Sequence, residues 1–250
     1  MRTAAIIQAR MASTRLPGKV MLDLGGRTVI EHVLSRCKVI RGVDVVCCAV
    51  PRTAENRPIL DIAEALEIET FEGSEHDVLA RYWEAGKALN ADVVLRVTSD
   101  CPLIDPLVCS EVLALIRSKE AEFACNNMPP TWPHGLDCEA VTFDWLDKAY
   151  FEANKPFERE HVMPWIRNHP NVKKANYICP HDGIEQHRWT IDKDCDFQFL
   201  RELWKRLPQG EKENFSYCTP LSIVTSEPKL LAINAGQDRF EGLKKSMSVS

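Results

Sequence analysis

Four short apolar segments alternate with helix-like segments in the first hundred residues. The apolar segments span residues 4–8, 43–50, 67–71 and 91–98, and the intervening segments 27–39, 56–66 and 74–89 carry apolar residues at helical spacing. Strands that are apolar throughout and separated by helices are typical of a parallel sheet covered on both faces. Ligands of such sheets bind beyond the carboxyl ends of the strands. We therefore predict an α/β fold with a mostly parallel, Rossmann-like sheet and one site at those ends.

The composition changes at Pro129, where a segment rich in proline, tryptophan and polar residues begins. We predict a single domain, 1–250, in which residues 129–187 form an inserted lid or dimerisation lobe. The chain is then expected to return to the core near Arg188. A chain of 250 residues is long enough for one α/β domain with such an addition.

A loop rich in cations and hydroxyls follows the first predicted strand in the sequence QARMASTRLPGK, residues 8–19. Its cations and hydroxyls are Arg10, Ser13, Thr14, Arg15 and Lys19. Arginine offers a planar fork to phosphate oxygens and lysine a point charge, while a glycine lets the backbone approach closely. The loop matches neither GxxxxGK[ST] nor GxGxxG, which argues against a P-loop kinase or a Rossmann dehydrogenase. It predicts a triphosphate site; the alternative is a solvated basic turn.

Two carboxylates are candidate metal ligands near this loop. Asp100 follows the fourth strand in RVTSDCPLIDP, where Arg96, Thr98 and Asp100 alternate and so share one side. Asp192 lies at the end of a further apolar strand predicted in RWTID, and the next two aspartates, Asp194 and Asp196, are expected to cap the following helix. Mg²⁺ prefers one or two carboxylates together with phosphate oxygens and water. The pattern predicts metal-assisted nucleotidyl transfer, although Asp100 could instead be a turn or cap residue.

The segment GSEHDVLARY begins the third predicted helix. Ser74 is a plausible N-cap, and Arg81 lies four residues after Asp77 on the same helix face. Because a helix N-terminus favours anions, these residues could contact the nucleotide or the sugar. The alternative is an N-cap with a stabilising ion pair.

Charge and cysteine usage exclude several classes of protein. The net charge of −5 argues against a general nucleic-acid binder, and no segment approaches the length of a membrane span. Ten cysteines occur without a CxxC pair, so neither a disulfide scaffold nor a zinc site is expected. We interpret the thiols as reduced and mostly buried, which predicts a cytoplasmic protein.

Six motifs carry a resemblance that spans about residues 3–245. They are QARMASTRLPGK, GSEHDVLARY, RVTSDCPLIDP, HGLDCEA, EREHVMPWI and RWTIDKDCDF. In this order they resemble cytidylyltransferases of the spore-coat polysaccharide (SpsF-like) type, which are similar to the CMP-sialic acid, CMP-pseudaminic acid and CMP-Kdo synthetases. The resemblance implies a glycosyltransferase-A-like nucleotidyltransferase fold, CTP as donor, Mg²⁺ as cofactor and a homodimer. The implied product is a CMP-activated sugar acid for surface polysaccharide biosynthesis.

The resemblance also implies roles for individual residues. The nucleotide-binding set is Gln8, Ala9, Arg10, Ser13, Arg15 and Lys19, extended by Ser74, Asp77, Arg81, Arg96 and Thr98. Of these, Arg10, Arg15 and Lys19 act in catalysis together with Asp100, and Asp100 and Asp192 hold the metal. Thr98 stands where the CMP-Kdo enzymes have a glutamine that helps read the base, a role that Arg96 could take over. Lys193 replaces the threonine or proline usual after the second acidic position.

The acceptor side is expected in the predicted lobe and near the last core segment. Its candidate residues are His134, Asp137, Glu139, His161, His187 and Arg188. His187 and Arg188 could hold an acceptor carboxylate, while His161 could equally be a half-buried helix histidine. Trp132, Trp165 and Trp189 could line an acceptor pocket or form the core of the lobe.

Two alternatives to a CMP-sugar synthetase remain open from the sequence. A related enzyme could use UTP or GTP, or transfer a nucleotide to a sugar phosphate, a polyol phosphate or a phosphonate. The second alternative is a non-catalytic nucleotide-binding subunit, although such a subunit would not need both the cationic loop and Asp100.

Overall fold

The predicted alternation of strands and helices is present in the computed structural model, which describes residues 1–208, 215–241 and 244. The strands are β1 (Thr3–Gln8), β2 (Val45–Pro51), β3 (Glu69–Gly73), β4 (Val93–Thr98), β5 (Phe123–Cys125), β6 (Glu139–Thr142) and β7 (Lys174–Asn176). They form one sheet in the order β3-β2-β1-β4-β6-β5-β7. Only β6 runs antiparallel to its neighbours, so the sheet is mostly parallel, as predicted.

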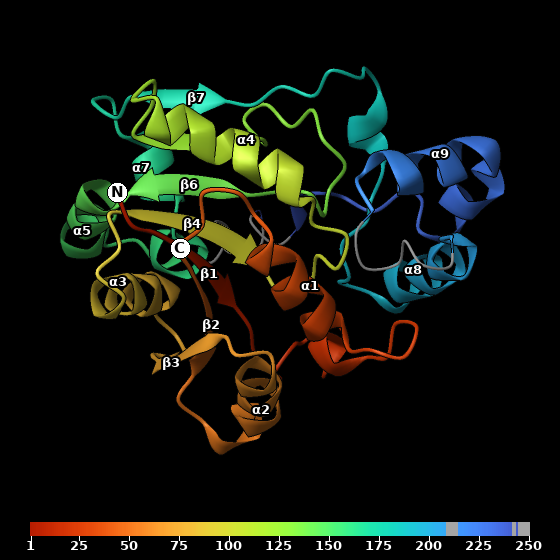
Figure 1. The fold of residues 1–250 in the computed structure, drawn as a ribbon, viewed down its shortest axis with the longest axis horizontal. Coiled ribbons are helices and arrows are strands. Elements are labelled where there is room, and N and C mark those ends of the chain that lie inside the picture. Colours follow the sequence, from red (N-terminus) through yellow and green to blue (C-terminus); the bar gives the residue numbers. More distant parts are fainter. Residues whose placement is uncertain (209–214, 242–243, 245–250) are drawn as a thin grey trace.

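Helices cover both faces of the sheet (Figure 1). One face packs against α1 (Val29–Lys38), α2 (Arg57–Ala65) and α4 (Pro106–Arg117). The other face packs against α3 (Val78–Ala88), α5 (Phe143–Glu152) and α7 (Pro164–Asn168). Because both faces are covered, the strands are apolar at successive positions, and Ala4 to Ile7 are fully buried.

A third hydrophobic cluster lies beyond the carboxyl ends of β1 and β4. Helices α8 (Asp194–Arg206) and α9 (Cys218–Ser226), on the right in Figure 1, pack there around Trp132 and Trp189. Trp165 packs instead against the core between the sheet and helices α3, α5 and α7. The tryptophans therefore belong to the cores, which was one of the two roles predicted for them.

The segment 129–187 does not form a separate lobe along its whole length. It supplies β6 and β7 to the central sheet and helices α5, α6 (Pro156–His161) and α7 to one face of the molecule. The segment KKANYIC has the pattern of a strand and contains β7, whereas β6 is only four residues long and its apolar pattern is too brief to distinguish from loop sequence.

Two local predictions differ from the structure. Helix α3 begins at Val78 with Asp77 as its N-cap, so Ser74 is not the cap. Residues 188–191 are not a strand of the sheet, because they pair with loop residues instead. Arg188 forms an isolated bridge with His134, and Ile191 N donates to Asp100 O. Such pairing between loops cannot be distinguished from a sheet strand by periodicity.

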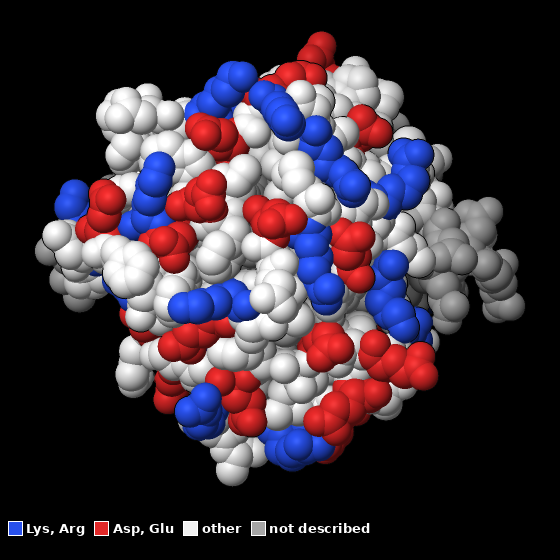
Figure 2. All heavy atoms as spheres, turned by 60° about the vertical axis from the view of Figure 1, so that its left-hand side comes forward, with Lys and Arg blue, Asp and Glu red and all other residues white. Residues whose placement is uncertain are grey.

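The surface carries charges of both signs (Figure 2), and most of the thiols lie inside the protein. In the face shown in Figure 2, basic and acidic side chains are intermingled over the surface. All ten cysteines are free thiols, and all but Cys195 and Cys218 are buried, which confirms the predicted burial. Within the described residues, no helix combines the length and the apolarity that crossing a membrane requires.

Candidate active site

The cationic loop is held at the end of β1 by backbone contacts. Met11 N donates to the side-chain oxygen of the buried Asn56 at 2.9 Å, and Gly18 N donates to Met11 O at 3.1 Å. Gly18 has φ +66, a left-handed conformation that a glycine adopts without steric cost. The loop is thereby closed on itself, and the short 3-10 helix η1 (Lys19–Met21) starts directly after it.

Lys19 joins the two predicted carboxylates. Its Nζ lies 2.6 Å from Asp100 Oδ2 and 2.8 Å from Asp192 Oδ1, and it also donates to Ile191 O at 2.7 Å. Arg15 Nη2 reaches Asp192 Oδ1 at 2.8 Å. Residues separated by more than 170 positions in the chain thus meet at one point, where two cations and two carboxylates compensate each other.

The charges of this cluster are mutually stabilised. Burial raises the pKa of Asp100, but Lys19 outweighs that effect and leaves the pKa of Asp100 below its ordinary value. The same balance, with Arg15 added, lowers the pKa of Asp192. Burial lowers the pKa of Lys19, and the two aspartates more than offset it, so its pKa is raised. All three groups are charged at neutral pH.

The donor set fits Mg²⁺ in chemistry. Asp100 and Asp192 present hard oxygen ligands to a common cation, here the Lys19 ammonium. Among the described residues there is no cluster of three or more histidine, cysteine or acidic side chains that could hold a metal alone. Two carboxylates with phosphate oxygens from a nucleotide are the combination that Mg²⁺ commonly uses.

A cavity of about 680 Å³ opens beside this cluster. Twelve of the predicted site residues line it: Gln8, Ala9, Arg10, Ser13, Arg15, Lys19, Arg81, Arg96, Thr98, Asp100, His161 and Asp192. They come from the ends of β1 and β4, from α3 and α6, and from the segment before α8. Arg10 makes no hydrogen bond or ion pair with the described residues, so its guanidinium is available to a ligand. Among the described lining residues, none comes from the segment that directly follows β2.

The predicted pairing at the start of α3 is different in the structure. Asp77 accepts from Ala80 N at 2.9 Å and forms an ion pair with Arg159 of α6, not with Arg81. Arg81 is buried and donates to Ser74 O at 2.6 Å, while its Nε has no partner among the described residues. Neither Ser74 nor Asp77 lines the cavity, so they shape its wall through Arg81 and Arg159.

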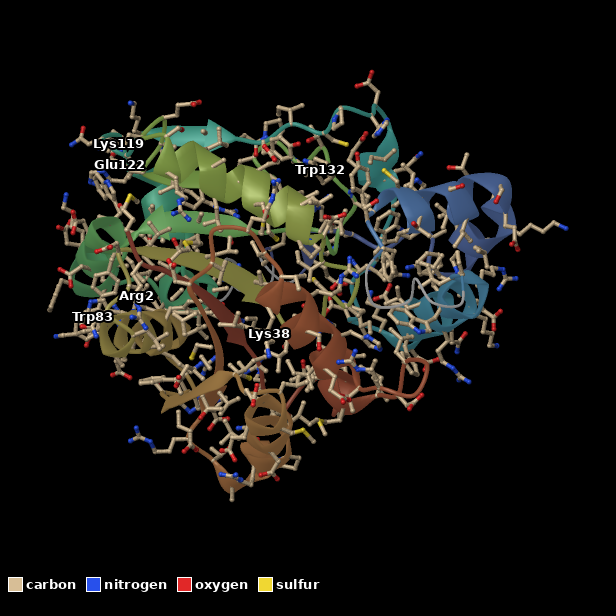
Figure 3. All side chains as sticks on the ribbon, viewed as in Figure 1. Arg2, Lys38, Trp83, Lys119, Glu122 and Trp132 are labelled. Atoms are coloured by element: carbon tan, nitrogen blue, oxygen red, sulfur yellow. The ribbon has the colours of Figure 1, made fainter. Side chains whose placement is uncertain are left out.

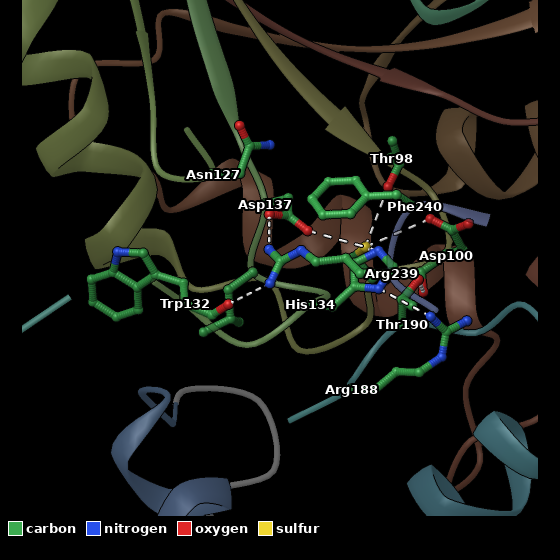
Figure 4. A network of polar contacts seen from close by, with 12 residues as sticks. Thr98, Asp100, Asn127, Trp132, His134, Asp137, Arg188, Thr190, Arg239 and Phe240 are labelled. Carbon is green, nitrogen blue, oxygen red and sulfur yellow. Dashed lines mark hydrogen bonds and ion pairs between the residues drawn. The ribbon is translucent and has the colours of Figure 1, made fainter. Parts of the chain in front are cut away.

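The predicted acceptor residues are mostly outside the cavity. Figure 4 shows His134, Asp137 and Arg188 in a polar network with Arg239. Arg188 donates to Asp196 at 2.8 Å and contacts His134 Nδ1 at 3.1 Å, and Arg239 pairs with Asp137. His187 stacks against Trp189 at a ring separation of 6.0 Å. Of the six predicted acceptor residues, only His161 lines the cavity.

The structure adds site residues that the sequence did not indicate. His76, Glu75, Arg159 and Glu160 line the cavity opposite the loop. His76 and Arg159 stand inside two of the motifs that carry the resemblance, but nothing in their spacing shows that α6 faces the start of α3. Neither of the two aspartates predicted to cap α8 is its N-cap, which is Lys193; Asp196, at the third helical position, accepts from Lys193 N and from Asp192 N at 3.0 Å.

Comparisons with known proteins agree with this geometry. A family model described as "Cytidylyltransferase" matches residues 4–219. A spore coat polysaccharide biosynthesis protein, SpsF of Bacillus subtilis, is 27% identical over 89% of this chain and 94% of its own. An uncharacterized protein of Methanocaldococcus jannaschii is 36% identical over 82% of this chain and 84% of its own. A solved cytidylyltransferase from Leptospira borgpetersenii superposes with a TM-score of 0.87 at 30% identity, covering 95% of this chain and all of that one.

Proposed function

The chain belongs to the cytidylyltransferase family, and from that premise we propose that it transfers CMP from CTP to a sugar acid. The acceptor hydroxyl attacks the α-phosphorus of CTP, the bond to the bridging oxygen breaks, pyrophosphate leaves and the hydroxyl proton passes to water. The observation that carries the proposal is the Lys19 ammonium held by Asp100 and Asp192 beside a cationic cavity. The similarity to SpsF supports a role in polysaccharide biosynthesis.

The loop residues would act on the triphosphate. Arg10 and Arg15 offer planar donors to phosphate oxygens, and Lys19 offers a point charge. Charge that develops on the departing pyrophosphate is stabilised by cations already fixed in place, which is the main contribution a protein makes to such a transfer. Residues Gln8, Ala9 and Ser13 complete the wall on the loop side.

Asp100 and Asp192 would hold Mg²⁺ when nucleotide is bound. The metal would neutralise phosphate oxygens and assist departure of pyrophosphate. Lys19 pairs with both carboxylates and keeps them ionised and oriented toward one point. Arg188 Nη2 also contacts Asp192 Oδ2 at 3.2 Å and so fixes the second carboxylate from its outer side.

The proposal is tested by pyrophosphate release from CTP with a panel of sugar acids, with and without Mg²⁺. Release that requires CTP, Mg²⁺ and a sugar acid together is expected. In parallel, thermal stability is measured with each of the four nucleoside triphosphates, because a ligand at 100 times its Kd stabilises by about 2.7 kcal/mol. Stabilisation by another nucleotide but not by CTP, or release only with a sugar phosphate, would reject it.

We also propose that the enzyme is a cytoplasmic homodimer with part of the 129–187 segment at the interface. Phe151, in α5 of that segment, is 71% exposed and contacts Tyr150 and Trp83 at ring separations of 5.0 and 5.9 Å. Trp83 lies at the outer side of α3 (Figure 3). Sedimentation velocity should give a dimer, and Phe151→Ser should weaken it; a monomer at all concentrations would contradict the proposal.

A further inference from the structure

A second charged cluster lies beside the floor of the cavity, apart from the loop. In this cluster two guanidinium groups, of Arg96 on β4 and Arg167 on α7, share the carboxylate of Glu139 on β6. Arg96 Nη1 lies 2.7 Å from Glu139 Oε2, and Arg167 Nε lies 2.9 Å from Glu139 Oε1. With two positive charges and one negative charge, the cluster of Arg96, Glu139 and Arg167 has a net positive charge.

Of the three residues in this cluster, only Arg96 lines the cavity. Its side chain is 15% exposed, its Nε has no partner among the described residues, and its Nη2 reaches Gln8 Oε1 only at 3.5 Å. A largely buried cation with unused donors is costly unless an anion or a polar group completes it. Arg96 is therefore poised to bind an anion from the cavity side.

The surroundings maintain this positive charge. Burial raises the pKa of Glu139, but the charges of Arg167 and Arg96 outweigh this effect and leave the pKa below its ordinary value. The carboxylate therefore stays ionised and is shared by the two guanidinium groups. His161 also lines the cavity here, and burial lowers its pKa, which leaves the ring neutral at neutral pH. No second carboxylate contacts Arg96 among the described residues.

We propose that Arg96 binds the carboxylate of the acceptor, and that Glu139 and Arg167 are positioning residues that orient its guanidinium. The proposal rests on the proposed function and specifies its acceptor class as a sugar acid with the carboxylate and the attacking hydroxyl on one carbon. Holding the carboxylate then also places the hydroxyl. Because β4 carries Arg96 and leads to Asp100, the hydroxyl would lie between this subsite and the nucleotide phosphates.

The positions expected from the sequence are less suited to this role. Arg188 already donates to Asp196 and Asp192, and neither Arg188 nor His187 lines the cavity. A carboxylate at Arg188 would have to displace a fully buried partner, since Asp196 is 0% exposed. Arg96 needs no such exchange. The structure thus favours Arg96 for the acceptor rather than for the base of the nucleotide.

The test measures KM for CTP and for the acceptor separately in four variants, using 3-deoxy-manno-octulosonate and a sialic acid as acceptors. Arg96→Gln should raise the acceptor KM about 10-fold to 100-fold, as expected for loss of a charged hydrogen bond, with the CTP KM within about twofold of wild type. Arg167→Gln should raise the acceptor KM about fivefold with a smaller change in kcat, and Arg167→Lys should recover part of that loss. Arg57→Gln, which removes exposed ion pairs on α2, is the matched control.

The outcomes separate this inference from the proposed function. Transfer to a sugar acid with an acceptor KM that is independent of Arg96, or a CTP KM that rises in parallel, would overturn the subsite and leave the function intact. If wild type transfers to no sugar acid, the proposed acceptor fails, and calorimetry with pyruvate as a carboxylate probe, in the presence of CTP, decides the subsite alone. Binding of pyruvate that is lost in Arg96→Gln supports it, and binding that is unchanged, or none in wild type, rejects it.

Discussion

The two ends of the cavity are built in different ways. The loop end takes Arg10, Ser13, Arg15 and Lys19 from one segment of ten residues, held by short backbone contacts. The Arg96 end takes its three charged residues from β4, β6 and α7; Glu139 lies 43 positions after Arg96 and 28 positions before Arg167.

This difference separates two kinds of design. At the loop end, side chains are presented from a turn, and replacing one of them should leave the surrounding core in place. At the Arg96 end, the charges are part of the packing between the sheet and α7, so binding and stability depend on the same contacts. Variants at the two ends should therefore differ in what they lose: catalysis alone at the loop end, and acceptor binding together with stability at the Arg96 end.

Glu139→Gln should give the largest loss of stability. The variant leaves two guanidinium groups without their shared carboxylate, and breaking a buried ion pair in this way costs about 3–5 kcal/mol. Because the pKa of Glu139 is lowered by folding, its contribution is present above the unfolded glutamate value of 4.5 and is lost as pH falls through the folded value. Urea unfolding should show a gap between wild type and variant that is constant near neutrality and shrinks below pH 4.5. A gap that widens in acid would contradict this account.

Asp100→Asn should give the largest loss of catalysis with little loss of stability. Lys19 keeps Asp192 as a partner, so the loop stays in place, while one of the two hard ligands is removed. We expect kcat/KM to fall about 10²-fold to 10³-fold, the cost of removing one preorganised electrostatic contact. Pyrophosphate release at saturating Mg²⁺ measures it. Near-normal turnover would refute the metal assignment, and a large drop in unfolding free energy would refute the contrast between the two ends.

Asn234→Ala should have a moderate effect, because it acts on the loop end from a distance. The buried Asn234 donates to Arg188 O at 2.9 Å and to Asp196 Oδ1 at 3.2 Å, and Asp196 in turn accepts from Asp192 N. Loss of these bonds should destabilise by about 1–2 kcal/mol and lower kcat/KM about tenfold. Thermal unfolding and steady-state kinetics measure both effects, with the exposed Asn171→Ala as control. Equal kinetics in the two variants would show that Asn234 has no positioning role.

Removal of metal should have the smallest effect on the free protein. Lys19 already compensates both carboxylates, so EDTA should leave the Tm of the nucleotide-free enzyme within about 1 °C. The extra stability conferred by CTP should decrease under the same conditions, because the phosphates and the carboxylates then share no Mg²⁺. A fall in Tm without nucleotide would indicate a metal bound by the protein alone.

Most of the fold is determined by sequence patterns of short range. The strands β1 to β4 and the helices between them follow from apolar runs and helical spacing, and the cationic loop directly after β1 follows from the strand that precedes it. Asp100 could be placed near the loop because the carboxyl ends of parallel strands share an edge. The pattern places Asp192 there at the end of a further strand, but its segment is not a strand of the sheet, and the loop contact of Ile191 N with Asp100 O brings it to the site instead.

The tertiary structure alone decided the acceptor side. No local pattern indicates that β6 inserts antiparallel between β4 and β5, and only this insertion brings Glu139 to Arg96. Likewise, α6 faces the start of α3 through the pairing of Arg159 with Asp77, which lie 82 positions apart. Periodicity reports which face of an element is apolar, but ion pairs form wherever packing brings opposite charges together. The sequence therefore determined the loop and its sheet, and long-range packing decided which charges border the cavity.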